Sequence, residues 1–514
     1  MSTPAITPTH ILLCLILLLS LGLRLPFHHI TFFSVDEAVS AVVGSSILEG
    51  GLPYKDAIDH RGPLTYYAYA GIFALTGSGD MAGVHTIYIW LYLGLSLGIW
   101  WIGKTSFSEK VGVWAALLFT VFSWANPFHE MWAAHTEWLL TAASLVGMGV
   151  WLNARGRWHR CLLAGMLFGL CTLSKQVGAL EVGAVLGYLV LRGWGANKDK
   201  RVGFTKEAGF LLLGWGVPMA LTAWGFWWSG AWEDWVFYLW TYNTAYYMPE
   251  IEGIRRGMNT LKLFGAFFLH KWMLLGVIAW TIYHRISKVG RHPRELWLIC
   301  WVGAAFLEAM AGGRAFLHYL IPALIPLCLL GAVGIVHLLQ RQKQKRWLKP
   351  MLIIGLVWPI LVTGYHHSFM FHTDTSITEF EAIVEEIRST TTEADQIFVW
   401  GFAPEIYVLS GRSPASRFSF CNVLTGHIPA GNESKEDTRY AIVPGSWDIL
   451  MQELAHHPPT YIIDTQVADY RAYGKYPIGQ YPLATLLEAE YELAQEFHQQ
   501  HPEVIFDVYQ RRKP

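Results

Sequence analysis

HILLCLILLLSLGLRLPF, residues 10–27, is the first of a series of apolar runs that decide the fold. Runs of roughly 17 to 25 apolar residues are long enough for a helix to cross a membrane. The residues before this run lack basic character and no small-residue cleavage site follows it, so we expect it to be retained as a span. We expect about ten further spans, at 82–103, 110–125, 137–152, 161–174, 176–194, 207–228, 268–284, 295–311, 315–338 and 350–365.

The composition is that of a polytopic α-helical membrane protein. Hydrophobic residues make up 53% of the 514 residues and charged residues only 15%, which leaves more apolar surface than a soluble enzyme can bury. The formal net charge is -1, so the chain has no basic field to attract a polyanion, and we exclude nucleic acid as a partner. Membrane lipids are the surroundings that this composition requires.

Basic residues predict the orientation of these spans. If 63–78 (PLTYYAYAGIFALTGS) lies at the membrane surface and does not cross, five basic loops fall on the same side as the N-terminus, and far fewer Lys and Arg residues remain opposite. The positive-inside rule then places the N-terminus in the cytoplasm. Lys271 indicates that the eighth span begins near residue 268, with 256–267 as another surface stretch. The basic loops are 104–110, 155–160, 192–206, 285–294 and 341–349.

The polar C-terminal region has the pattern of a small α/β domain. Its buried strands are predicted at 396–401 and 460–465, and its helices at 377–391 and 446–456. An odd number of spans places this region outside the cytoplasm. We therefore predict two domains, a membrane domain of residues 1–365 that includes the first outer loop, 28–81, and an outer α/β domain of residues 366–514.

Two acidic residues follow the first span. Ser34 and Glu37 have the spacing of a capping box, so Glu37 has a structural explanation. Asp36 suits a helix N-terminus electrostatically, but the box does not need it. Because Asp36 also lies close to the predicted membrane edge, we expect it to be functional.

A mixed-charge cluster follows in the same loop, where Asp59, His60 and Arg61 precede Gly62 and Pro63. Arginine offers a permanent charge and a planar fork that suits phosphate. The structural alternative is that Arg61 only anchors the following helix at the interface.

Further ionisable residues lie at the outer ends of spans. Such groups are costly within a membrane and need partners, so we expect function at Lys175, Arg314 and His318, with Glu181 and Glu308 as candidate counter-ions. The adjacent histidine pairs 28–29 and 366–367 point apart on regular elements, so we expect no metal site there.

Together these motifs resemble the GT-C superfamily of polyprenyl-phosphate-sugar-dependent glycosyltransferases, in particular bacterial relatives of protein O-mannosyltransferases and the lipid A aminoarabinose transferase. The resemblance rests on Asp36-Glu37, on the segment 51–64 and on Gly313-Arg314-Ala315-Phe316-Leu317-His318-Tyr319. It implies that Asp36 is the catalytic acid of the first outer loop. Arg61 stands where many relatives carry Lys, and His60 replaces an acidic residue of some relatives, so Asp59 is the candidate for a second carboxylate.

The resemblance implies a glycosyltransferase that moves a sugar from a polyprenyl-phosphate donor to an acceptor hydroxyl, with inversion, on the periplasmic face of a bacterial inner membrane. The acceptor stays open between a glycan, a lipid and a protein. No resident cofactor is expected, and a divalent metal is the less favoured alternative. The candidate catalytic residues are Asp36, Glu37 and Asp59, and the candidate ligands of the lipid phosphate are His60, Arg61, Lys175, Arg314, His318 and Tyr319.

Two rival functions come from other classes. A transporter or flippase of lipid-linked glycans would bind its substrate near the middle of the membrane and would contain inverted repeats. The polar residues here cluster at one face and we find no repeat. A receptor would need far fewer spans to anchor its outer domain.

Overall fold

The computed structural model divides the chain into two compact units, which are described separately. We call Met1–His29, His85–Gly225 and Gly253–His372 the helical unit, and Ile30–Val84, Phe226–Glu252 and Thr373–Pro514 the α/β unit. The structure describes residues 7–77, 79–194, 197–247, 253–283, 295–314, 316–341, 346–374, 377, 380–466, 470–498 and 505–512.

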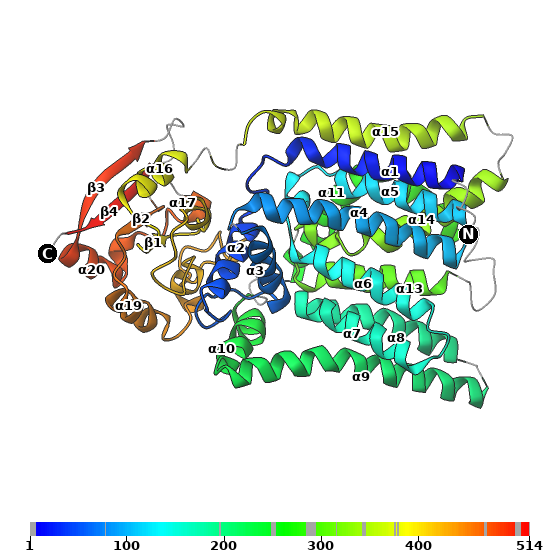
Figure 1. The fold of residues 1–514 in the computed structure, drawn as a ribbon, viewed down its shortest axis with the longest axis horizontal. Coiled ribbons are helices and arrows are strands. Elements are labelled where there is room, and N and C mark those ends of the chain that lie inside the picture. The colour runs from blue at the N-terminus through cyan, green and yellow to red at the C-terminus, as the bar shows by residue number, and fades with distance from the viewer. Residues whose placement is uncertain are drawn as a thin grey trace. The chain divides into compact units, whose positions relative to one another are not determined.

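The helical unit is built from long apolar helices that lie side by side (Figure 1). Each predicted span overlaps a helix, and the eighth, 268–284, begins at the end of the helix Gly253–Leu269 and takes in the helix Trp272–Thr281. The predicted loop 285–294 lies outside the described residues. The helices are α1 (Pro8–Arg24), α4 (Met81–Ser106), α5 (Glu109–Trp124), α6 (Thr136–Leu152), α7 (Trp158–Ser174), α8 (Ala179–Gly193), α9 (Lys198–Trp228), α11 (Gly253–Leu269), α12 (Trp272–Thr281), α13 (Leu296–Ala311), α14 (Leu324–Arg341) and α15 (Leu348–His366).

Within the described residues, 5 helices are long and apolar enough to cross a membrane, or up to 6 if the bent pair is one span. Several others, such as α6 and α13, are apolar but shorter. The total of about eleven crossings therefore stays a prediction. Two starts differ from the predicted bounds. Helix α14 begins at Leu324 and not near 315, because Leu317–Leu320 forms a separate 3-10 turn, and α9 begins at Lys198 and not near 207.

The bent pair breaks at Lys271, the residue that indicated the start of the eighth span. Helices α11 and α12 meet there at 99°. The buried Lys271 ammonium donates to the carbonyl of Ala125 at 3.1 Å and to Oδ1 of Asn126 at 2.9 Å. A buried ammonium needs such acceptors to offset its lost hydration, so the break places this charge beside polar groups.

The α/β unit combines a four-stranded sheet with short helices. The sheet order is β1-β2-β4-β3, in which β1 and β2 are parallel and the other pairs antiparallel. The unit contains the helices α2 (Val35–Leu48), α3 (Pro63–Thr76), α10 (Trp232–Val236), α16 (Glu381–Thr390), α17 (Glu405–Ser410), α18 (Asn422–Thr425), α19 (Ser446–His456) and α20 (Leu483–Glu490), and the strands β1 (Ile397–Trp400), β2 (Tyr461–Asp464), β3 (Tyr491–His498) and β4 (Ile505–Arg511).

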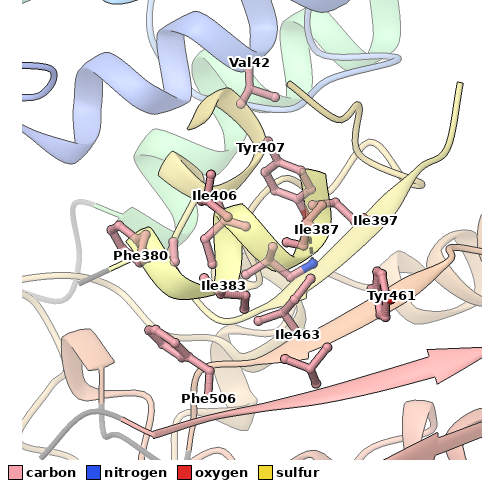
Figure 2. Close-up of a cluster of buried hydrophobic side chains, with 14 residues drawn as sticks. Val42, Phe380, Ile383, Ile387, Ile397, Ile406, Tyr407, Tyr461, Ile463 and Phe506 are labelled. Atoms are coloured by element: carbon pink, nitrogen blue, oxygen red, sulfur yellow. Dashed lines mark hydrogen bonds between the residues drawn. The ribbon is translucent and has the colours of Figure 1, made fainter. Parts of the chain in front are cut away.

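The first outer loop folds together with the C-terminal region. Figure 2 shows Val42 of α2 over a buried cluster contributed by α16, α17 and the sheet, in which Val399 N–H donates to the Tyr407 hydroxyl at 2.8 Å. Gly44 allows α2 and α3 to pack closely, since a Cβ there would lie 2.9 Å from Cβ of Tyr69. The compact units therefore do not follow the predicted boundary at 365/366, because the loop 28–81 contributes to the C-terminal core.

Candidate functional site

Arg61 links two carboxylates in the α/β unit. Its Nη2 donates to Oδ1 of Asp36, and its Nη1 donates to Oδ2 of Asp59 at 2.5 Å. Asp36 lies in the first turn of α2, whose N-cap is Ser34, and its side chain is 25% exposed. The Asp59 side chain is 1% exposed. The guanidinium thus holds one accessible and one buried acid, and all three residues were singled out from the sequence.

The backbone around Arg61 is fixed by further hydrogen bonds. Tyr54 OH donates to the Arg61 carbonyl at 2.6 Å, and Arg61 N–H donates to the Tyr66 hydroxyl at 3.1 Å. Oδ1 of Asp59 accepts from His60 N–H at 2.8 Å, and Nδ1 of His60 lies 3.1 Å from the same oxygen. These contacts fix the backbone from Asp59 to Arg61.

Electrostatics keep both members of the buried pair charged. Burial alone would raise the pKa of Asp59, but the Arg61 guanidinium and the contacts to His60 outweigh burial and hold that pKa well below its usual value. Burial would likewise lower the pKa of Arg61, and Asp36 with Asp59 raises it well above its usual value. The cluster has two carboxylates for one guanidinium.

Glu37 has a structural role that differs in detail from the predicted capping box. Its Oε2 accepts from Phe33 N–H at 2.7 Å, one residue before the N-cap, while Ser34 Oγ accepts from Asp36 N–H at 3.3 Å. Glu37 is 1% exposed. Asp36 and Glu37 thus bond to different groups.

A tyrosine-rich π-helix, Phe237–Tyr247, contacts the same site and was missed from the sequence. Asn243 Nδ2 donates to the His60 carbonyl at 2.9 Å, and the His60 ring lies 4.6 Å from the Tyr247 ring and 5.8 Å from the Tyr242 ring. π-Helical turns are rare and occur frequently at functional sites. The signal in the sequence was the aromatic run FYLWTYNTAYY itself.

In the helical unit, Lys175, His318 and Tyr319 gather in one cluster, although they were identified in separate motifs. Lys175 Nζ donates to Oε1 of Glu137 at 2.6 Å and lies 3.6 Å from the Tyr319 ring centroid. Nδ1 of His318 lies 2.7 Å from Oε1 of Glu130. This cluster can present a cation and an imidazole to an anionic ligand.

Three residues of this cluster were missed. The carboxylates of Glu130 and Glu137 hold His318 and Lys175, and the His135 ring stacks on that of His318 with centroids 4.1 Å apart. They come from the turn before α6 and from its first turn, so only the fold brings them to residues far along the chain. Acids close to a helix start, as in HTEWLL, were the available signal.

The pairings considered from the sequence, of Glu181 with Lys175 and of Glu308 with Arg314, are not found as hydrogen bonds among the described residues. Oε2 of Glu181 accepts from Ser144 Oγ and from Trp301 Nε1, the latter at 2.7 Å, and not from Lys175. Glu308 is buried, and neither of its carboxylate oxygens has a hydrogen-bond partner among the described residues, so it does not pair with Arg314.

Arg314 is almost fully buried in the helical unit, at 1% exposure. It follows Gly313, which has a φ of 65° and whose backbone leaves room for Arg256, since a Cβ there would meet Nε of Arg256 at 2.6 Å. Arg61 belongs to the other unit. The expectation that Arg61, Arg314 and His318 bind one phosphate therefore stays a prediction.

The comparisons with known proteins agree with the expected superfamily. A family model described as dolichyl-phosphate-mannose-protein mannosyltransferase matches residues 60–219, which include His60, Arg61 and Lys175 but not Asp36. No curated protein sequence matches the chain. Proteins of comparable architecture are found among the solved structures.

The chain has the fold of two proteins of known structure. It is similar to ArnT from Cupriavidus metallidurans, solved with undecaprenyl phosphate, with a TM-score of 0.62, 13% identity and 97% of both chains covered. It is also similar to the Archaeoglobus fulgidus oligosaccharyltransferase, solved with Zn and sulfate, with a TM-score of 0.58, 13% identity and 96% and 72% of the two chains covered. The predicted GT-C-like architecture is confirmed, and 5 of the described helices are long and apolar enough to cross a membrane.

Proposed function

We propose that this protein is a glycosyltransferase that moves a sugar from a polyprenyl-phosphate donor to the hydroxyl of an acceptor. The observation that carries the proposal is the ion-paired cluster of Asp36, Arg61 and Asp59 at the start of α2, in a chain with this fold. The solved complexes of the similar proteins contain undecaprenyl phosphate in ArnT and dolichol-phosphate in the oligosaccharyltransferase. They support a lipid-phosphate carrier for this chain as well.

Asp36 is the proposed general base. It is the accessible carboxylate of the cluster, and ionised Asp36 can accept the proton of the acceptor hydroxyl as the oxygen attacks the anomeric carbon. The bond from that carbon to the phosphate oxygen breaks at the same time, and its electron pair leaves with the lipid phosphate. A single displacement of this kind inverts the anomeric centre. The departing phosphate needs no proton, so no acid partner is required.

Arg61 has a different proposed role from the phosphate ligand that the sequence indicated. Its guanidinium already bonds two carboxylates, so its charge is more than compensated within the cluster. It fixes the position of the Asp36 carboxylate. We therefore treat Arg61 as a positioning residue.

For the donor phosphate we propose the cluster of the helical unit. Lys175 donates one hydrogen bond to Glu137, and an ammonium has three N–H groups. His318 and Tyr319 lie beside it. The buried Arg314 is proposed to add to the positive potential. Charge of this kind stabilises the phosphate that departs in the transition state.

The test is transfer from radiolabelled polyprenyl-phosphate sugar by the purified protein. A glycosyltransferase forms a new glycosidic bond and releases polyprenyl phosphate. A flippase in vesicles moves the labelled lipid across the bilayer and leaves it chemically unchanged. Transport without bond cleavage would replace the proposal with the alternative function.

Replacing Lys175 separates donor binding from catalysis. We expect Lys175→Met to raise the KM for the donor by about tenfold, the effect of losing one charge-assisted contact of about 1.4 kcal/mol. Because the change also leaves Glu137 buried without its cation, Glu137→Gln is combined with it to protect folding. A double variant that folds and keeps a normal donor KM contradicts the role. Lys104→Met, at an exposed pair with Glu109, is the matched control.

We further propose a bacterial inner membrane location with the N-terminus in the cytoplasm. The basic loops on the side of the N-terminus support this orientation. A reporter that works only in the periplasm should therefore be active when it is fused after Tyr365. A cytoplasmic signal at that position reverses the orientation, and with it the face at which the reaction is proposed.

A further inference from the structure

The α/β unit contains a polar cleft that the proposed mechanism does not use. Its volume is about 600 Å³, large enough for a small-molecule ligand. The walls come from the C-terminal half of α2, from residues that follow α2 in the first outer loop, and from the loop 411–419 after α17. Val42 and Tyr407 belong both to this cleft and to the buried cluster of Figure 2, so the cleft adjoins a packed core.

The lining of this cleft includes the side chain of Ser419. It is 1% exposed, and its Oγ has no hydrogen-bond partner among the described residues. Other serines of the same loop are bonded: Ser413 Oγ donates to Glu49 at 2.8 Å, and Ser416 Oγ donates to Glu453 at 2.7 Å. A buried hydroxyl that lacks a partner costs folding free energy. A bound ligand would supply the missing partner.

The charges of the cleft disfavour an anionic ligand. Four acidic residues line it and outnumber the two arginines. Arg417 is already paired with Glu453 at 2.6 Å, and Arg412 donates to the hydroxyl and carbonyl of Thr391. A lipid phosphate or an acidic sugar would meet net negative charge. The four acidic residues are Glu49, Asp56, Asp80 and Glu453.

The remaining lining suits the ring of a sugar. Serine hydroxyls, carboxylates and the Gln396 amide can bond to sugar hydroxyls, and the aliphatic side chains of Val42 and Val408 offer apolar surface for the C–H face of the ring. Neutral carbohydrate combines these two kinds of surface. The cleft therefore fits a neutral saccharide better than it fits an apolar or an anionic molecule.

We propose that this cleft binds a neutral saccharide and holds the acceptor glycan during transfer. The acceptor role rests on the proposed function, whereas saccharide binding does not. Helix α2 joins the two places, because Asp36 lies in its first turn and Ser45 lines the cleft nine residues later. At about 1.5 Å per residue, this separation is roughly 14 Å along the helix. A short oligosaccharide anchored in the cleft can extend along α2 towards the base.

Binding is tested with the full-length protein in a detergent that lacks a sugar headgroup, since alkyl glycosides would compete. The probes are maltotriose, chitotriose and mannotriose, with trigalacturonate as the anionic control, and the readout is saturation-transfer NMR. We expect at least one neutral trisaccharide to bind at millimolar concentration and trigalacturonate not to bind. Failure of all three neutral probes, or stronger binding of the anionic one, overturns the proposal.

A single hydroxyl tests the location. Ser419→Ala removes a group with no described protein partner, so we expect an unchanged or higher Tm, and a Kd for the bound trisaccharide that is raised about tenfold. Ser389→Ala, on the exposed face of α16, is the control and should leave the Kd unchanged. Equal binding by wild type and Ser419→Ala contradicts this site.

The two proposals fail in different ways. If the acceptor role holds, Ser419→Ala raises the KM for the acceptor and leaves kcat unchanged. Trisaccharide binding in a protein without transferase activity removes the proposed function but keeps the saccharide site. Transferase activity whose acceptor KM does not respond to Ser419→Ala keeps the enzyme and removes the acceptor role.

Discussion

Asp36→Asn is expected to lower kcat by about 10² to 10⁴, the usual contribution of general base catalysis, with little change in folding or in donor binding. Asparagine keeps the size of the side chain, and its Oδ1 can still accept the hydrogen bond from Arg61. What it loses is the ability to take the proton of the acceptor. Single-turnover sugar transfer, measured with the Tm and the donor Kd, separates this chemical loss from a folding defect.

Glu37→Gln is the matched control at the neighbouring position. The neutral amide oxygen can accept from Phe33 N–H as the carboxylate does, so we expect activity close to wild type. If both substitutions were severe and a chelator inhibited the enzyme, the two acids would act as metal ligands and the general base role would be wrong. An Asp36→Asn enzyme with normal kcat would require another base. Asp59 is a poor replacement in this structure, because it is buried and paired with Arg61.

Local patterns predicted the first turn of α2 and the residues of its site. The capping spacing at Ser34, the charged run at Asp59 to Arg61 and the Gly-Pro that starts α3 are signals contained within a few residues. The ion pairs among these residues follow from short separations along the chain, since Arg61 is only 25 residues from Asp36. Sequence reasoning could therefore name the members of this cluster, although not the division of roles within it.

Partners that lie far apart in sequence could not be found in this way. Lys175 was matched with Glu181, a near neighbour, whereas its partner Glu137 is 38 residues away on another helix. The same limit explains the missed strands β3 and β4, which are antiparallel to their neighbours: β4 pairs with β2, and β3 pairs with β4. It also explains why the first outer loop was assigned to the membrane domain, since only packing places Val42 in the core of the C-terminal region.

Arg61→Ala is expected to reduce both stability and activity, because it leaves the buried Asp59 carboxylate without its cation. Removing one partner of a buried ion pair typically costs about 3 to 5 kcal/mol. Arg61→Lys keeps the positive charge but loses the planar fork of the guanidinium. Lysine can therefore hold one of the two carboxylates well, but not both. We expect a stability between those of wild type and Arg61→Ala, with low activity. Denaturant unfolding and transfer rates are measured on the same samples.

The pH dependence gives this expectation a second measurement. The pKa of Asp59 is depressed in the folded protein. The Asp59–Arg61 pair therefore stabilises the fold at a pH above the unfolded pKa of Asp, which is about 4. This stability is lost as the pH falls through the lower pKa of the folded state. In Arg61→Ala the Asp59 pKa rises, and acid should then no longer destabilise the protein through this group.

A double-mutant cycle decides whether the loss comes from the buried carboxylate. Asp59→Asn removes the charge that Arg61→Ala would leave uncompensated, so the double variant should be more stable than the sum of the single effects predicts. Additive losses would mean that the buried Asp59 carboxylate does not depend on Arg61 for its stability. If stability recovers in the double variant while transfer does not, Arg61 acts on Asp36 as well as on Asp59. The change that then remains at the base is the loss of the guanidinium that fixes the Asp36 carboxylate.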